Sequence, residues 1–178
     1  DTIDLRTEQA RIQSLLILGL EGVGKTRFIG TCPRPLLLYS FDGGYRTLAG
    51  IPGIRVKVFM DPDRNSPKAA QEFEAQFRDV FVAGKEPPYK WPDGREEPFK
   101  TLAVDPLSFW SNAEAQRIQK TNGTTSKKMN WDEYDVLLKR GQDMLRLGMR
   151  AVEERGMFFV ATSHLVTEKD EDTGQIWF

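Results

Sequence analysis

The sequence predicts an α/β fold in which a mostly parallel central sheet is flanked by helices. The chain has 178 residues, of which 39% are hydrophobic, enough for one domain with a sizeable core. Short apolar runs of strand length alternate with helix-like segments, and several runs are continuously apolar, as expected of strands covered on both faces. The expected strands are residues 14–18, 36–40, 54–59, 101–105 and 157–162.

A first long helix is predicted over residues 66–84. Ser66 is a suitable N-cap, Pro67 suits the first helical position and Gly84 suits the stop. The following segment, up to residue 100, carries four prolines and an Asp-Gly pair. This composition predicts an exposed loop or a β-excursion that leads into the next strand.

A second long helix is predicted over residues 130–156. Asn130 and Glu133 have the spacing of a capping box, and Gly156 suits the C-terminal end. The last residues, "GQIWF", read as part of a strand. We therefore expect residues 1–178 to form a single domain that is cut short at its C-terminal end.

Composition excludes several classes of protein. The formal net charge of −1 gives no global attraction to nucleic acid or to an acidic membrane, so any polyanion site must be local. The single cysteine, Cys32, allows no disulfide within the chain and is expected to be a packing residue. No apolar run approaches the roughly 20 residues that span a bilayer, and no signal pattern opens the chain. These features favour a cytoplasmic protein without a membrane partner.

A phosphate-binding loop is predicted directly after the first strand. Gly19, Gly24, Lys25 and Thr26 satisfy the pattern G-x-x-x-x-G-K-[ST], and Gly22 adds a further glycine. Glycines let backbone N–H groups curl around phosphate oxygens, which requires unusual dihedral angles and no Cβ. The alternative is a glycine-rich turn with a solvated lysine.

In this loop the lysine supplies a charge to the β- and γ-phosphates, and the threonine hydroxyl binds Mg²⁺. The helix that follows presents its positive N-terminal end. We expect the lysine to face solvent when no nucleotide is bound. The predicted nucleotide-binding residues are Gly19, Leu20, Glu21, Gly22, Val23, Gly24, Lys25, Thr26 and Arg27.

Asp105 is the predicted second anchor for magnesium. It ends the apolar strand 101–105, where a carboxylate can hold a metal-bound water. By itself, an aspartate before Pro106 is equally suited to a turn or a cap. Its combination with Lys25 and Thr26 favours the metal role.

Two further residues are candidates for hydrolysis of the nucleotide. Asp42, just past the second strand, is placed to orient the attacking water, although Asp-Gly-Gly is also an ordinary turn. His164, the only histidine, follows the strand 157–162 and could contact the γ-phosphate, or could merely cap the strand. GTP is disfavoured because no N-K-x-D element follows a strand.

The segments "GLEGVGKT", "LLLYSFDGG", "TLAVDPLSFW" and "MFFVATSHLVTEKDEDTG" occur in an order that resembles the RecA-like ATPases of bacteriophages. The resemblance is strongest to the phage single-strand annealing ATPases and covers residues 14–177. It implies a RecA-like P-loop core with a C-terminal β-hairpin, ATP with Mg²⁺, and a ring or filament of identical subunits in the host cytoplasm. It also implies single-stranded DNA, and a single-strand DNA-binding protein, as partners in recombination.

Carried over by position, the resemblance makes Lys25 and Thr26 the nucleotide and metal residues, Asp105 the magnesium acid and His164 the sensor. One departure concerns the D-x-E-G-G pattern, where this chain has Ser40 and Asp42. The shorter acid puts fast hydrolysis in doubt, although not binding. Two other functions stay open: a small-molecule P-loop kinase, which needs an arginine-rich lid, and a nucleotide-gated assembly protein that does not hydrolyse ATP.

The segment "QKTNGTTSKKMNW" is the candidate for contact with DNA. Lys120, Lys127 and Lys128 lie in a small, polar and flexible stretch with no acid before Asp132. Such a loop could follow a phosphate backbone. The alternative is a solvated linker between two helices.

Overall fold

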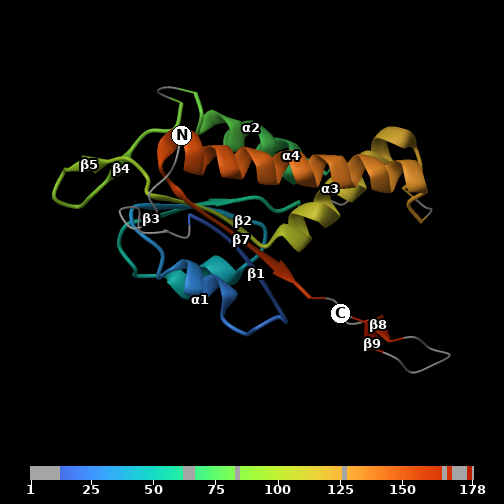
Figure 1. Cartoon of the computed structure of the whole chain (residues 1–178), viewed down its shortest axis with the longest axis horizontal. Helices are drawn as coiled ribbons and strands as arrows, with labels where there is room; N and C mark the ends of the chain where they lie inside the picture. Colours follow the sequence, from blue (N-terminus) through green and yellow to red (C-terminus); the bar gives the residue numbers. More distant parts are fainter. Residues whose placement is uncertain are drawn as a thin grey trace, which may run out of the picture.

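The computed structural model describes residues 13–61, 67–82, 85–125 and 128–165, together with the backbone of the pairs 168–169 and 176–177. Its centre is a sheet of five parallel strands in the order β1-β7-β6-β2-β3 (Figure 1). These strands are Ser14–Gly19 (β1), Leu36–Ser40 (β2), Ile54–Val58 (β3), Thr101–Asp105 (β6) and Phe158–His164 (β7). The predicted fold class is therefore confirmed.

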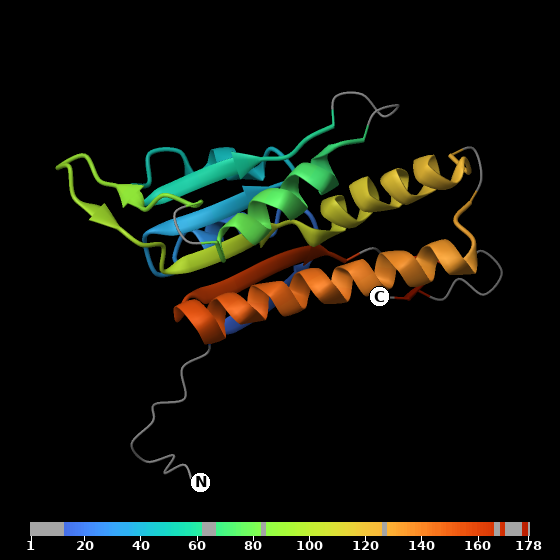
Figure 2. The ribbon, with the colours of Figure 1, turned by 90° about the horizontal axis from the view of Figure 1, so that it is seen from above.

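Helices cover both faces of the sheet, as Figures 1 and 2 show from two sides. α2 (Ala69–Asp79), α3 (Leu107–Asn122) and α4 (Trp131–Arg155) lie on one face, and α1 (Lys25–Ile29) with the 3-10 helix η1 (Gly44–Leu48) lies on the other. Because both faces are covered, the central strands β2 and β6 are buried throughout. This explains why their sequences are continuously apolar.

Alternate residues of β2 serve the two halves of the core, because successive side chains of a strand point to opposite faces. Leu36 and Leu38 pack with Ile29 of α1, whereas Leu37 and Tyr39 belong to the cluster under α2 and α4. That second cluster is rich in aromatic rings. It includes Phe41, Phe59, Phe73, Phe77 and Phe159.

The register of the strands decides where the loops meet. Gly19 at the end of β1 pairs with His164 at the end of β7, and Ser40 at the end of β2 pairs with Asp105 at the end of β6. Because the strands are parallel, all four residues lie at one edge of the sheet. The segments that follow β1, β2, β6 and β7 therefore begin side by side.

The first predicted long helix is shorter than expected. α2 begins at Ala69 after the N-cap residue Lys68, so Pro67 lies before the helix rather than in its first position. Asp61 supplies the cap from a distance, because its Oδ1 accepts the backbone N–H groups of Lys68 and Ala69 at 2.7 and 2.9 Å. The predicted cap Ser66 and stop Gly84 lie outside the described residues.

The second predicted long helix is confirmed at both ends. Asn130 and Glu133 form the reciprocal capping box of α4, and Gly156 closes the helix in the left-handed conformation. α4 runs beside α3, and Figure 2 shows the tip of this helix pair beyond the ends of the strands. The pair is called the α3–α4 hairpin below.

Two small antiparallel pairs complete the fold. The proline-rich segment forms the hairpin β4 (Tyr89–Lys90) with β5 (Glu96–Glu97), which confirms the predicted β-excursion. β8 (Glu168–Lys169) pairs with β9 (Ile176–Trp177), as expected for the C-terminal hairpin. Cys32 is buried in the core, in agreement with a packing role.

α4 packs tightly against Phe159 of the sheet at a glycine, and we expect Gly148→Ala to destabilise the fold by about 1–3 kcal/mol. A Cβ at this position would lie 2.3 Å from Cζ of Phe159. The matched control is Gly141→Ala on the same helix, where the nearest atom of Trp110 would be 3.7 Å away. The control should gain up to about 1 kcal/mol from helix propensity. Urea unfolding of both variants measures the difference, and equal stabilities would contradict this close approach.

Candidate nucleotide-binding site

The loop between β1 and α1 has the backbone that its glycines predict. Gly22 and Gly24 have φ angles of 79° and 93°, in the left-handed region that a side chain makes costly. A Cβ on Gly19 would lie 3.1 Å from the side chain of Val23, which folds back over the start of the loop. The three glycines therefore allow a tight loop whose N–H groups can face an anion.

Lys25 does not face solvent, contrary to our expectation. Its side chain turns back into the loop, where Nζ donates to the carbonyl oxygens of Gly19 and Leu20 at 2.8 and 2.7 Å. The residue is only 7% exposed. A buried ammonium group needs acceptors, and the loop's own carbonyl oxygens supply them when no phosphate is present.

Asp105 joins three separate segments of the chain. Its Oδ2 accepts the hydroxyl of Thr26 at 2.6 Å, and its Oδ1 accepts the hydroxyl of Thr162 from β7. The residue is 2% exposed. The pKa of this carboxyl is raised above its ordinary value, chiefly by burial and also by the charge of Asp42, whereas the two donated hydroxyls act to lower it. The carboxylate therefore links the loop to the sheet through two hydrogen bonds.

Asp42 is both a turn residue and a neighbour of this group. Its Oδ1 accepts the N–H of Gly44 at 2.7 Å, and its carbonyl oxygen accepts the hydroxyl of Ser40 at 3.0 Å. A Cβ on Gly44 would lie 2.9 Å from both Asp42 Oδ1 and Thr26 Oγ1. The Asp-Gly-Gly turn therefore places its carboxylate against the phosphate loop, so the two interpretations of Asp42 coexist.

His164 is the last residue of β7, because the strand extends two residues beyond the predicted end at Thr162. Its backbone N–H donates to Ser108 Oγ at 3.3 Å, and its ring meets that of Phe109 edge to face at 5.5 Å between centroids. Both partners belong to the first turn of α3. The imidazole is therefore held by α3 as well as by its own strand.

These residues surround one cavity of about 680 Å³ at the carboxyl edge of the sheet. Its volume lies within the range of small-molecule sites, roughly 300–1,000 Å³. Of the predicted loop residues, Gly19, Leu20 and Val23 do not line this cavity, and the side chains of Leu20 and Val23 are exposed. The wall consists of Glu21, Gly22, Gly24, Lys25, Thr26, Arg27, Asp42, Gly43, Gly44, Thr47, Asp105, Phe109 and His164.

A comparison with protein families agrees with this geometry. A family model described as AAA domain matches residues 11–177, which is nearly the whole chain. The chain belongs to the AAA domain family. This AAA domain is accordingly a nucleotide-binding P-loop ATPase domain, in agreement with its parallel sheet and its loop. A comparison with curated proteins gives no match.

Sequence reasoning missed residues that line the AAA domain's cavity and residues that hold its wall in place. Thr162 was visible only as a polar residue in an apolar strand, and nothing in the sequence linked it to Asp105. Ser108 and Phe109 gave no signal beyond their place after the Asp105 strand. Thr47 reaches the cavity through η1, which the sequence did not predict.

The oxygen atoms of the cavity fit a magnesium ion. Thr26 and Asp105 are in contact and Asp42 lies beside them, so the donors are the hard oxygen atoms that Mg²⁺ prefers. Within the described part of the chain, no three His, Cys, Asp or Glu side chains gather as a metal site of their own. A metal here would thus be shared between a few protein oxygens and a bound phosphate.

Two of the three lysines predicted to contact DNA are described, and both lie away from the AAA domain's cavity. Lys120 is in the last turn of α3 and Lys128 is exposed just before α4, so both belong to the tip of the α3–α4 hairpin. Lys127 lies outside the described residues.

Among the helices that the structure describes, none combines the length and apolar character needed to cross a bilayer.

Lys25→Ala is expected to weaken ATP binding at least about tenfold, because a charge-assisted contact is worth about 1.5–3 kcal/mol. Isothermal titration calorimetry of the AAA domain with ATP measures the loss. Lys85→Ala is a charge-matched control, since Lys85 is exposed and does not line the cavity. Circular dichroism checks that the variant is folded, and unchanged ATP affinity in a folded variant would refute the role of the loop.

Proposed function

We propose that this AAA domain binds ATP with Mg²⁺ in the cavity at the carboxyl edge of the sheet, hydrolyses it slowly, and acts on single-stranded DNA as a ring or filament of identical subunits. The observation that carries the first half is the convergence of Lys25, Thr26, Asp42, Asp105 and His164 on one cavity. The second half rests on the resemblance to phage recombination ATPases, with a single-strand DNA-binding protein as a further partner.

In this proposal Lys25 exchanges the carbonyl oxygens of Gly19 and Leu20 for the β- and γ-phosphates. The exchange costs little, because the ammonium group keeps hydrogen-bond acceptors in both states. The N–H groups of the loop bind the same phosphates. Nucleotide binding would therefore rearrange a lysine that already lies in the cavity wall.

Thr26 and Asp105 would hold the metal, which neutralises phosphate charge when it is bound. Thr162 keeps Asp105 oriented from the side of β7 while the Thr26 hydroxyl turns to the metal. Asp42 would orient the attacking water and accept its proton. His164, fixed by Ser108 and Phe109, would contact the γ-phosphate.

A nucleotide-gated protein without hydrolysis is the second candidate, and one observation favours it. Oδ1 of Asp42 already accepts the N–H of Gly44, and the aspartate is one methylene shorter than the glutamate of the related pattern. Either feature limits how far the carboxylate can reach toward a water. Slow turnover or none is therefore compatible with tight binding.

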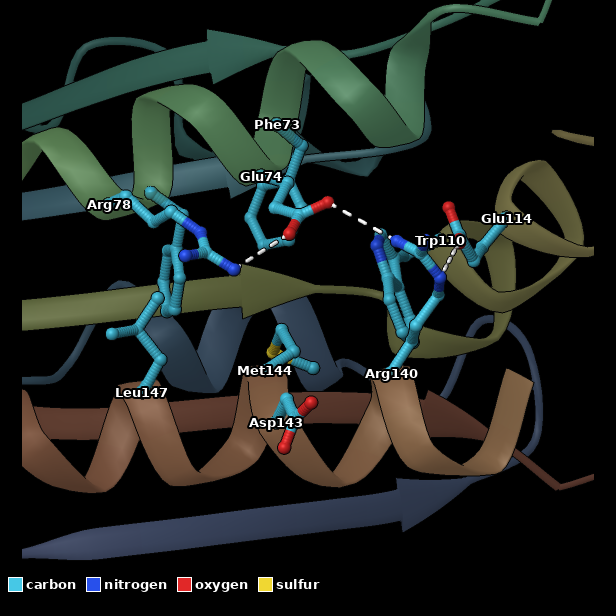
Figure 3. Close-up of a pocket in the computed structure, with 10 residues that line it drawn as sticks. Phe73, Glu74, Arg78, Trp110, Glu114, Arg140, Asp143, Met144 and Leu147 are labelled. Atoms are coloured by element: carbon cyan, nitrogen blue, oxygen red, sulfur yellow. Dashed lines mark hydrogen bonds and ion pairs between the residues drawn. The ribbon is translucent and has the colours of Figure 1, made fainter. Parts of the chain in front are cut away.

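The structure offers little support for a small-molecule kinase. A kinase needs an arginine-rich lid, but Arg140 of α4 pairs with Glu114 and Glu74, as Figure 3 shows. These residues line a second cavity of about 330 Å³ between α2, α3 and α4, which shares no wall residue with the nucleotide cavity. Arg146 and Arg150 pair with acids of their own helix. These three arginines of α4 therefore form ion pairs within the layer of helices and do not line the nucleotide cavity.

ATPase assays with and without single-stranded DNA separate these functions. Stimulation by DNA supports the proposal. Phosphorylation of a metabolite would support the kinase, and tight ATP binding without turnover would support the nucleotide-gated protein. Mass measured in solution with ATP and DNA tests the ring or filament.

Asp42→Asn is expected to abolish turnover while ATP affinity stays within about twofold, because the amide keeps the turn but cannot accept a proton. Asp42→Glu should speed hydrolysis by restoring the longer reach. Steady-state phosphate release measures both, with ATP affinity as the control. If both variants hydrolyse ATP like the parent, Asp42 is only a turn residue.

Replacing Lys120, Lys127 and Lys128 together by alanine should flatten the salt dependence of single-stranded DNA binding. Each lost phosphate contact lowers the slope of log affinity against log salt by about 0.7, so the total change is roughly 2. Lys90→Ala, in the hairpin β4–β5 at the other end of the molecule, is the control (Figure 1). An unaltered slope and affinity in the triple variant would move the DNA site elsewhere.

A further inference from the structure

Two aromatic rings stand exposed side by side at the start of α4. Trp131 is 89% exposed and Tyr134 is 52% exposed, with 6.4 Å between the ring centroids. Leu138, one turn further along the same stripe, is 61% exposed. Single exposed apolar residues are common, but a nearly bare tryptophan next to a tyrosine and a leucine is a patch that needs an explanation.

The position of the patch explains its exposure. α4 buries Met144, Ala151 and Val152 against the sheet in its second half, whereas its first turns extend beyond the strand ends (Figure 2). No described part of the sheet reaches this far. The rings therefore contribute little to the core, and their removal should leave the fold intact.

The rings are presented on a fixed support. Glu133, on the opposite side of the helix start, is buried and accepts hydrogen bonds from Asn122 Nδ2, the Thr124 hydroxyl and the backbone N–H of Asn130. Thr124 and the other donors hold the pKa of this carboxyl below its ordinary value, so it is ionised at neutral pH. Because the start of the helix is already ordered by these bonds, binding of a ligand there costs little conformational entropy.

The charge around the patch is mixed rather than strongly basic. Lys128 is exposed beside the start of α4, and Asp135 is neutralised by Lys139 at 2.6 Å, which leaves Asp132 as an opposing charge. A ligand held here must therefore gain most of its affinity from the ring faces. Three side chains are also far fewer than the roughly 20–30 residues that each side of a stable protein interface contributes. Nucleobases need much less surface, because each one stacks on a single ring.

We propose that Trp131 and Tyr134 form a stacking platform for successive bases of single-stranded DNA, with Lys128 contacting the strand's backbone. The proposal rests on the proposed function for its choice of ligand and names the surface that would bind it. Stacking is tolerant of sequence because every base has a π-face, so the platform would suit a protein that acts on DNA of any sequence.

The test measures binding of a fluorescently labelled oligo-dT to the whole chain with ATP and Mg²⁺ present. Trp131→Ala and Tyr134→Ala should each weaken binding roughly 5- to 150-fold, the range expected for one stacked base. Trp131→Phe and Tyr134→Phe keep a ring and should retain most of the affinity. Leu138→Ala is the matched control on the same stripe and should have no effect.

Two further readouts distinguish stacking from charge. The salt slope should be unchanged in Trp131→Ala, whereas Lys128→Ala should flatten it by about 0.7. A strand of the same length without bases can stack on neither ring, so it should bind the parent protein more weakly than oligo-dT binds Trp131→Ala, and it should lose nothing further in that variant.

Each contrary result has its own meaning. If the parent binds oligo-dT and the alanine variants bind it equally well, the platform is refuted while the proposed function stands. If the parent binds no oligo-dT, the DNA part of the proposed function fails, and the platform fails with it. If Leu138→Ala acts like Trp131→Ala and both lower the mass of the assembly, the patch is a contact between subunits instead.

Discussion

The hydrogen bonds to the Asp105 carboxylate are the interactions on which the cavity at the carboxyl end of the sheet depends. The carboxylate is buried where β6 ends, and it accepts hydroxyls from Thr26 at the start of α1 and from Thr162 on β7. A buried carboxylate is costly unless it is hydrogen-bonded, and these two donors come from segments that are distant in sequence. The same bonds that make its burial tolerable also hold the phosphate loop against the sheet, so fold and site share one constraint.

The order of the strands makes these contacts possible. β7 lies between β1 and β6, so a residue of β7 can reach Asp105 while His164, two positions later, sits beside Gly19 at the sheet edge. The cavity is thus formed by the ends of neighbouring parallel strands and by the turns after them, in the way expected for open α/β sheets. The chemistry comes from loops, and the sheet supplies their alignment.

The sequence predicted those parts of the molecule that depend on local patterns. The central strands followed from continuous apolar runs, α4 from its capping box and Gly156, and the phosphate loop from the spacing of its glycines. What it could not show were contacts between distant segments. Asp61 capping α2, Thr162 on Asp105 and Lys25 turned into its own loop all depend on the tertiary structure. The exposure of Trp131 was likewise invisible, because it depends on where the sheet ends.

α3 connects the cavity at the carboxyl end of the sheet with the start of α4. Its first turn touches His164 through Ser108 and Phe109, and its last residue, Asn122, is bonded to Glu133 at the start of α4. The helix has 16 residues and is therefore about 24 Å long. One helix therefore spans the distance from the cavity at the carboxyl end of the sheet to the exposed rings at the start of α4.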